Sequence, residues 1–172
     1  MNRKTLIATR SVLAILICLN LWLIFFFSSE NGEESSERSD GVADVIAGVI
    51  VDGYEEMTPP EQSEVRRNIG LPIRKLAHIT EYLTLSFLIC TLVSTFTEKL
   101  IFRLSVGVAF SFLYAMSDEL LHQGLVSGRA GVFTDVLIDS FGAILGAILA
   151  WVIYAKLTKL LKGNRKNENN EV

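Results

Sequence analysis

The chain has 172 residues, of which 50% are hydrophobic and 20% are charged, and its formal net charge at pH 7 is −3. Its apolar residues fall in blocks long enough to cross a bilayer, which needs about 20 residues, rather than in the short runs of a soluble domain. The sequence has no basic patch interleaved with aromatic residues, so no nucleic-acid partner is predicted. Its two cysteines, Cys18 and Cys90, sit in apolar blocks and give no disulfide framework.

Four hydrophobic segments predict four transmembrane helices, at about residues 7–27, 76–96, 100–117 and 132–155. The first segment ends in three phenylalanines, residues 25–27, and lacks the cleavage site of a signal peptide, so we expect an uncleaved anchor. The fold class expected is therefore all-α, a polytopic membrane protein that forms a single domain over residues 1–172.

A long loop, residues 28–73, separates the first two predicted spans, and we expect it to be partly helical. Branched apolar residues recur there at helical spacing, at Val42, Val45, Ile46, Val49 and Ile50. They predict a short amphipathic helix against the membrane surface or the other helices. A second helix is expected to start at Pro59, because proline is tolerated in a first turn. The stretch Glu30 to Asp40 is expected to be solvated and mobile.

The distribution of basic residues predicts the orientation. Lysine and arginine gather in both terminal segments and in the turn near residue 99, whereas the 28–73 loop holds 11 acidic and three basic residues. By the positive-inside rule, both termini are cytoplasmic and the 28–73 and 116–131 connections face outward. The expected location is therefore a cytoplasmic membrane, crossed several times.

Ionisable residues enter three of the predicted spans from the outward side, although a charge at the bilayer centre costs about 2.5–3.5 kcal/mol. Within each span they recur at the spacing of a helix face: Arg74, His78 and Glu81; Asp118 and His122, with Glu119 and Gln123 on the adjoining ridge; Asp135 and Asp139. Such residues usually face a cavity or a partner helix. The sequence therefore predicts a polar pocket that opens outward.

A glycine pair follows the acidic residues of the last predicted span. Gly142 and Gly146 are four residues apart, which lets another helix approach closely. The expected partner is the second or third span of the same chain, and a homo-oligomer built on this seam is the alternative.

Several ordered motifs resemble those of the VanZ-like family. They are Phe27-Ser28-Ser29-Glu30, Arg74-Lys75-x-x-His78-x-x-Glu81-Tyr82, and Ser117-Asp118-Glu119-Leu120-Leu121-His122-Gln123 followed by Gly128-Arg129, Asp135 and Asp139. The resemblance extends over almost the whole chain, although the D-E-L-L-H-Q run is one residue longer than in the family pattern. It implies a cell-envelope membrane protein of a family associated with low-level resistance to the glycopeptide teicoplanin in Gram-positive bacteria.

Three functions remain open, and anion recognition ranks first. In it, Arg74, Lys75 and Arg129 pair with the phosphate or carboxylate of a membrane lipid, a lipid-linked cell-wall precursor or a glycopeptide. The candidate ligand-binding residues are Arg74, Lys75, His78, Glu81, Glu119, His122, Gln123, Arg129, Asp135 and Asp139.

The second function is an intramembrane hydrolase or transferase, whose acid–base candidates are His78, Glu81, Asp118, Glu119 and His122. The third is a non-catalytic scaffold in which buried ion pairs only fix the helix packing. No cofactor is expected. No metal is expected either, because the histidines and carboxylates are numerous but show no known metal-ligand spacing.

Overall fold

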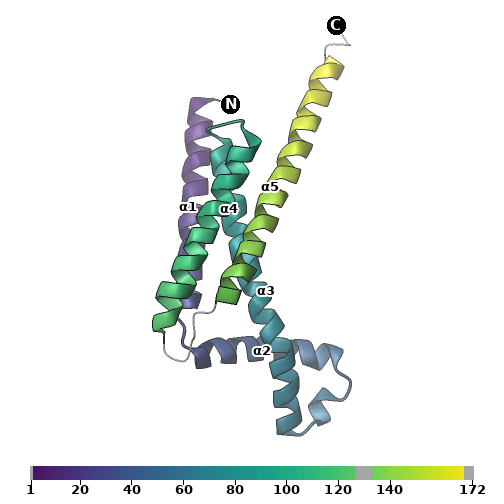
Figure 1. Cartoon of the computed structure of the whole chain (residues 1–172). Coiled ribbons are helices and arrows are strands. Elements are labelled where there is room, and N and C mark those ends of the chain that lie inside the picture. The colour runs from purple at the N-terminus through teal and green to yellow at the C-terminus, as the bar shows by residue number, and fades with distance from the viewer. Residues whose placement is uncertain (1, 127–132, 169–172) are drawn as a thin grey trace.

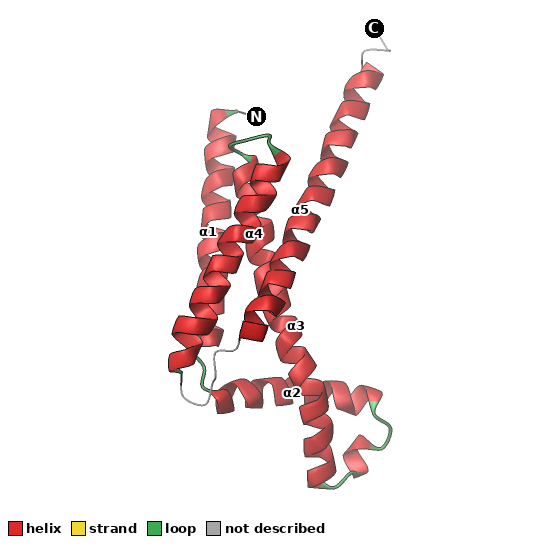
Figure 2. Cartoon of the chain, viewed as in Figure 1, coloured by secondary structure: helices red, strands yellow, loops and turns green. Residues whose placement is uncertain are grey.

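The computed structural model describes residues 2–126 and 133–168, with side chains up to Lys159. All regular elements of these residues are helical, and no strand occurs among them (Figure 2). The long helices are α1 (Arg3–Ser28), α2 (Gly32–Ile50), α3 (Pro59–Ser94), α4 (Leu100–Ser117) and α5 (Phe133–Glu168). Short 3₁₀ helices cover Tyr54–Glu56 and Gln123–Leu125, and a π-helical turn, Asp118–His122, continues α4.

Four helical segments are long and apolar enough to cross a membrane: α1, α3, α4 with its π turn, and α5. They pack side by side in one bundle (Figure 1). The prediction of an all-α polytopic protein with four spans is therefore confirmed. The start of α1, the α3–α4 turn and the end of α5 lie at one end of the bundle, which places both chain ends on the same side (Figure 1).

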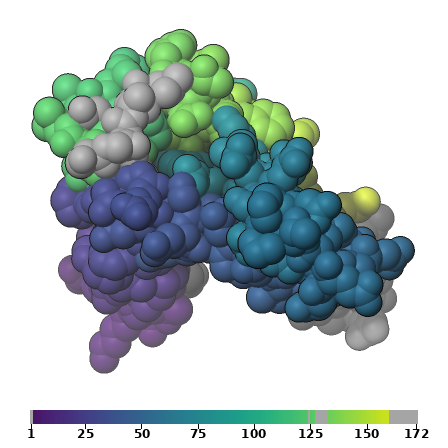
Figure 3. Space-filling view, turned by 90° about the horizontal axis from the view of Figure 1, so that it is seen from below, coloured from purple at the N-terminus to yellow at the C-terminus, as the bar shows by residue number. Residues whose placement is uncertain are grey.

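Helix α2 lies across the opposite end of the bundle, beside the first turns of α3 (Figures 1 and 3). Its buried residues are small ones at four-residue spacing, Ser35, Ser39, Ala43 and Ala47. Its larger residues Val42, Val45, Val49 and Ile50 are exposed. The amphipathic helix was thus predicted correctly, and its exposed apolar face is the one expected to meet the membrane surface.

The stretch Glu30 to Asp40 differs from the sequence-based expectation, because most of it is the first half of α2. A capping box stabilises this start. The side chain of Asn31 accepts hydrogen bonds from the backbone N–H groups of Glu33 and Glu34, and the Glu34 carboxylate accepts one from the backbone N–H of Asn31. Local hydrogen bonds therefore order this stretch, although its composition is typical of a solvated segment.

Helix α3 is continuous from the predicted helix start at Pro59 through the second predicted span. Pro72 lies inside it without ending it, since a proline removes only one backbone hydrogen bond and neighbouring packing can retain the helix. The first turns of α3 project past α2, beyond the bundle (Figure 1). This continuity places Arg74, which begins the polar stripe, beside α2.

Close packing of α5 on α3 fixes the position of the polar residues. A Cβ atom at Gly142 or Gly146 would meet the backbone carbonyl of Ile79 or Leu83, in each case well inside 3.0 Å. The glycine pair therefore packs against the second span of the same chain, as the sequence predicted. The buried apolar core lies alongside, formed by Ile24, Tyr82, Leu85, Ile89, Ala115 and Val136.

Candidate functional site

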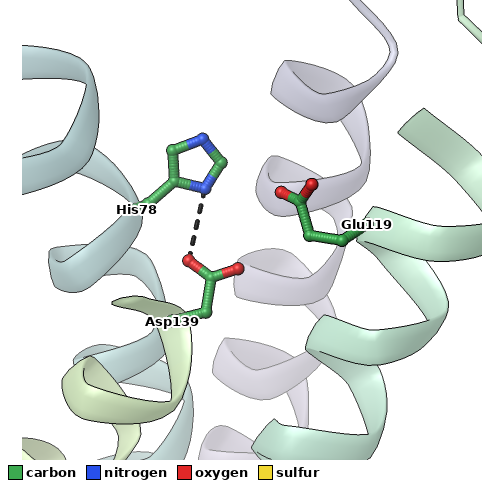
Figure 4. A group of neighbouring side chains, drawn as sticks. All are labelled: His78, Glu119 and Asp139. Carbon is green, nitrogen blue, oxygen red and sulfur yellow. Dashed lines mark ion pairs between the residues drawn. The ribbon is translucent and has the colours of Figure 1, made fainter. Parts of the chain in front are cut away.

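Three ionisable side chains from three segments converge inside the bundle: His78 of α3, Glu119 of the π turn and Asp139 of α5 (Figure 4). One donor atom of each lies within 4.8 Å of the other two. Glu119 and Asp139 are buried, and the His78 side chain is only 18% exposed. The sequence placed all three on polar stripes, and the fold brings these stripes together.

The contacts within this cluster do not fully neutralise the negative charge of Asp139. Its Oδ1 lies 3.4 Å from Nδ1 of His78, which is within ion-pair distance. This separation exceeds the roughly 2.7–2.9 Å of a charge-assisted hydrogen bond. Among the described residues, neither carboxylate oxygen of Asp139 nor Nδ1 of His78 has a hydrogen-bond partner. A buried carboxylate in this state is costly unless something else neutralises it.

A layer of hydrogen bonds surrounds Glu119 on its other side. Gln123 Nε2 donates to a carboxylate oxygen of Glu119 and, at 3.2 Å, to Oδ2 of Asp118. Ser28, at the end of α1, donates from Oγ to the same Asp118 oxygen at 2.5 Å. Asp118 and Glu119 are thereby held in place by α1 and by the turn that follows α4.

The π turn explains how neighbouring acids reach different partners. Its backbone bond runs from the Gln123 N–H to the Asp118 carbonyl, five residues back, so the hydrogen-bonded loop holds one residue more than in an α-helix. Such turns occur frequently at functional sites.

His122 is directed away from the cluster, toward α1. Its Nδ1 lies 3.2 Å from Oδ1 of Asp118, and its Nε2 lies 3.3 Å from Oγ of Ser29. The imidazole also stacks on the Phe25 ring, with centroids 4.5 Å apart. The fold therefore does not unite the two histidines: His78 faces α5, and His122 fastens the π turn to α1.

A cavity of about 200 Å³ lies among α1, α2 and α3, at the α2 end of the bundle. Charged and polar groups share its wall with apolar side chains. The lining residues are Phe27, Ser28, Glu30, Ser35, Arg38, Ser39, Val42, Ile73, Arg74, Ala77, His78 and Glu81. This cavity is hereafter the α2 pocket. His78 contributes both to its lining and to the buried cluster.

The two arginines of the α2 pocket differ in their partners. Arg38 forms an ion pair with Glu30 and lies over the Phe27 ring, 4.7 Å from its centroid. Arg74 donates from Nη2 to the hydroxyl oxygens of Ser36 and Ser39, at 3.0 and 3.3 Å. Its buried Nε has no hydrogen-bond partner, and no described carboxylate lies within ion-pair distance of it.

The remaining candidates lie at the margins of the site. Lys75 and Asp135 approach each other at 3.5 Å, and both are well exposed. Arg129 lies outside the described residues. Sequence reasoning did not select Arg38 or the α2 serines as site residues; the four-residue spacing of Ser35 and Ser39 was the available signal.

The family model described as VanZ/LLP1 matches residues 13–154 of the chain. The match runs from within α1 into α5, and so includes every element that contributes to the buried cluster and the α2 pocket. Searches of curated proteins and of solved structures found no match. The resemblance inferred from the polar motifs is therefore confirmed, and the chain belongs to the VanZ/LLP1 family of multi-pass membrane proteins.

Proposed function

We propose that this protein binds an anionic amphiphile, a lipid with a phosphate or carboxylate headgroup, in the α2 pocket. The proposal includes the orientation expected from the basic residues, with both termini cytoplasmic and α2 on the outer face of the bacterial membrane. The lipids in question then belong to the outer leaflet.

The observation that carries the proposal is the set of hydrogen-bond partners of Arg74. Arg74 is half-buried, and among the described residues its guanidinium donates only to neutral hydroxyl oxygens. A guanidinium presents several N–H donors in a fork that fits carboxylate and phosphate oxygens. A bound anion would supply the negative charge and the acceptor that Arg74 lacks among the described residues.

The rest of the α2 pocket fits the other part of such a ligand. Phe27, Val42, Ile73 and Ala77 provide apolar surface beside the charged groups. Helix α2 crosses the end of the bundle with apolar residues exposed, as helices at the membrane interface do. A headgroup at Arg74 would therefore leave its acyl chains close to the hydrocarbon region.

An effect on teicoplanin susceptibility would follow from a site at this depth. Teicoplanin has an acyl chain that anchors it in the membrane, where its lipid-linked targets also lie. A protein that binds such headgroups in the outer leaflet competes for these targets or alters their presentation. Vancomycin lacks the anchor, so the effect on it should be smaller.

Native mass spectrometry of the purified full chain in detergent tests the binding directly. We expect the purified protein to retain phosphatidylglycerol. At the same concentration it should not retain phosphatidylcholine, whose headgroup has no net charge. A hydrogen bond to a charged group contributes about 1.5–3 kcal/mol. Arg74→Gln should therefore weaken phosphatidylglycerol binding by roughly 10- to 100-fold.

Lys99→Gln is the matched control. Lys99 lies in the α3–α4 turn at the other end of the bundle, is exposed, and does not line the α2 pocket, yet its substitution also removes one positive charge. It should bind phosphatidylglycerol as the parent does. Equal retention by Arg74→Gln and the parent, or equal retention of both lipids by the parent, would overturn the proposal.

A further inference from the structure

We propose that His78, Glu119 and Asp139 bind a divalent transition-metal ion of the Zn²⁺ or Mn²⁺ class. The site lies between α3, the π turn and α5, and is distinct from the headgroup site at Arg74 (Figure 4). It does not depend on the proposed lipid binding. No metal was expected from the sequence, because the three ligands stand on separate helices and form no local motif.

The distances suit an ion at the centre of the cluster. Two donor atoms that each lie about 2.1 Å from one tetrahedral ion are roughly 3.4 Å apart. The His78 Nδ1 and Asp139 Oδ1 atoms are separated by 3.4 Å. A Glu119 oxygen lies within 4.8 Å of one donor atom of each of the other two residues, so a small shift of its side chain completes the set.

The buried Asp139 carboxylate provides an independent reason to expect a cation. Its side chain has no exposed surface, and it points toward the other two residues (Figure 4). Neither of its oxygens has a hydrogen-bond partner among the described residues. With a neutral histidine and two carboxylates, the cluster carries a charge of −2, which one divalent ion balances.

The donor atoms indicate which cation fits. An imidazole nitrogen suits zinc and iron, and carboxylates suit manganese, whereas magnesium and calcium prefer oxygen ligands alone. Three protein ligands leave at least one coordination position for a water molecule. Gln123, which donates to Glu119, would orient that ligand as outer hydrogen-bond partners do in metal sites. His78 also lines the α2 pocket, so the cluster adjoins that cavity.

The test uses the full chain purified in detergent with a tag that binds no metal, stripped with a chelator and then titrated with Zn²⁺. After desalting, we expect elemental analysis by mass spectrometry to find about one Zn²⁺ ion per chain. Co²⁺ in place of Zn²⁺ should give visible absorption bands. Asp139→Asn should abolish both signals, with a loss of affinity greater than the roughly 10–100-fold that removal of an outer partner causes.

Asp135→Asn is the matched control, because it removes a carboxylate one turn earlier on α5, outside the cluster. It should keep the full equivalent and the Co²⁺ bands. Glu119→Gln repeats the test if Asp139→Asn does not fold. A parent that retains no metal overturns the proposal. So does stoichiometric metal that persists in Asp139→Asn and Glu119→Gln, since that metal would lie elsewhere.

Discussion

The backbone carbonyl of Leu83 occupies the space that a Cβ atom on Gly146 would need. Gly146→Ala should therefore force α5 away from α3 and destabilise the protein, by about 1–3 kcal/mol as for other overpacked sites. Because α5 carries Asp139, the same substitution should disturb the buried cluster. Thermal unfolding in detergent measures the effect.

Gly41→Ala is the control for this change. Gly41 lies in α2, and a Cβ atom there would meet nothing within 4 Å. Alanine is favoured over glycine inside a helix by about 1 kcal/mol. This variant should melt at the parent's temperature or above it. Equal melting temperatures for Gly146→Ala and Gly41→Ala would contradict the packing role of Gly146.

The sequence was sufficient to predict the four spans and the polar stripes along them, because both follow from hydrophobic blocks and helical spacing. It could not predict which way each side chain of a stripe faces. Four residues advance a helix by about 40° beyond a full turn. Arg74 therefore contacts the serines of α2, while His78, four residues later, faces Asp139 of α5.

Local hydrogen bonds explain two further differences. The acidic, serine-rich start of α2 has the composition of a solvated segment, but Asn31 and Glu34 form a capping box whose spacing is visible in the sequence. The π turn was not predicted from the sequence. The meeting of Glu119 with His78 and Asp139 depends on that turn and on helix packing, which one sequence does not reveal.

The segment between α1 and α3 should respond to acid at Asp44. A hydrogen bond from the Tyr54 hydroxyl, supported by Arg66 at 3.1 Å, lowers the pKa of Asp44 from its usual value of 3.8. The folded pKa is below the unfolded one, so the contribution to stability is present above pH 3.8. It is lost as the pH falls through the lower, folded value. Since Asp44 is largely exposed, we expect a small local effect.

Substitution of Tyr54 by phenylalanine tests this assignment. It removes the main cause of the shift and leaves Arg66 in place, so the pKa of Asp44 should rise toward 3.8 without reaching it. Carbon-13 NMR titration of labelled aspartate in detergent follows the carboxyl directly. Tyr114→Phe, inside the bundle, should leave the Asp44 titration unchanged. An unshifted Asp44 in Tyr54→Phe would show that the hydrogen bond does not control it.

Cysteine labelling checks the orientation that the proposed function assumes. In a background with Cys18→Ala and Cys90→Ala, Glu55→Cys lies in the exposed α2–α3 connection and Lys4→Cys lies at the other end of the bundle. We expect an impermeant maleimide to label Glu55→Cys in intact cells, and Lys4→Cys only after lysis. The reverse pattern would place the α2 pocket on the cytoplasmic side and exclude an outer-leaflet ligand.

Resistance measurements connect the α2 pocket with the family association. Expression in a susceptible Gram-positive host should raise the inhibitory concentration of teicoplanin more than that of vancomycin, because only teicoplanin is anchored at the depth of the pocket. Arg74→Gln should abolish the increase, and Lys99→Gln should retain it, at equal protein levels in the membrane by immunoblot. If Arg74→Gln protects as well as the parent does, resistance does not depend on the α2 pocket. If the parent protein retains phosphatidylglycerol in detergent but protects against neither drug, the lipid site stands and its link to glycopeptides is wrong.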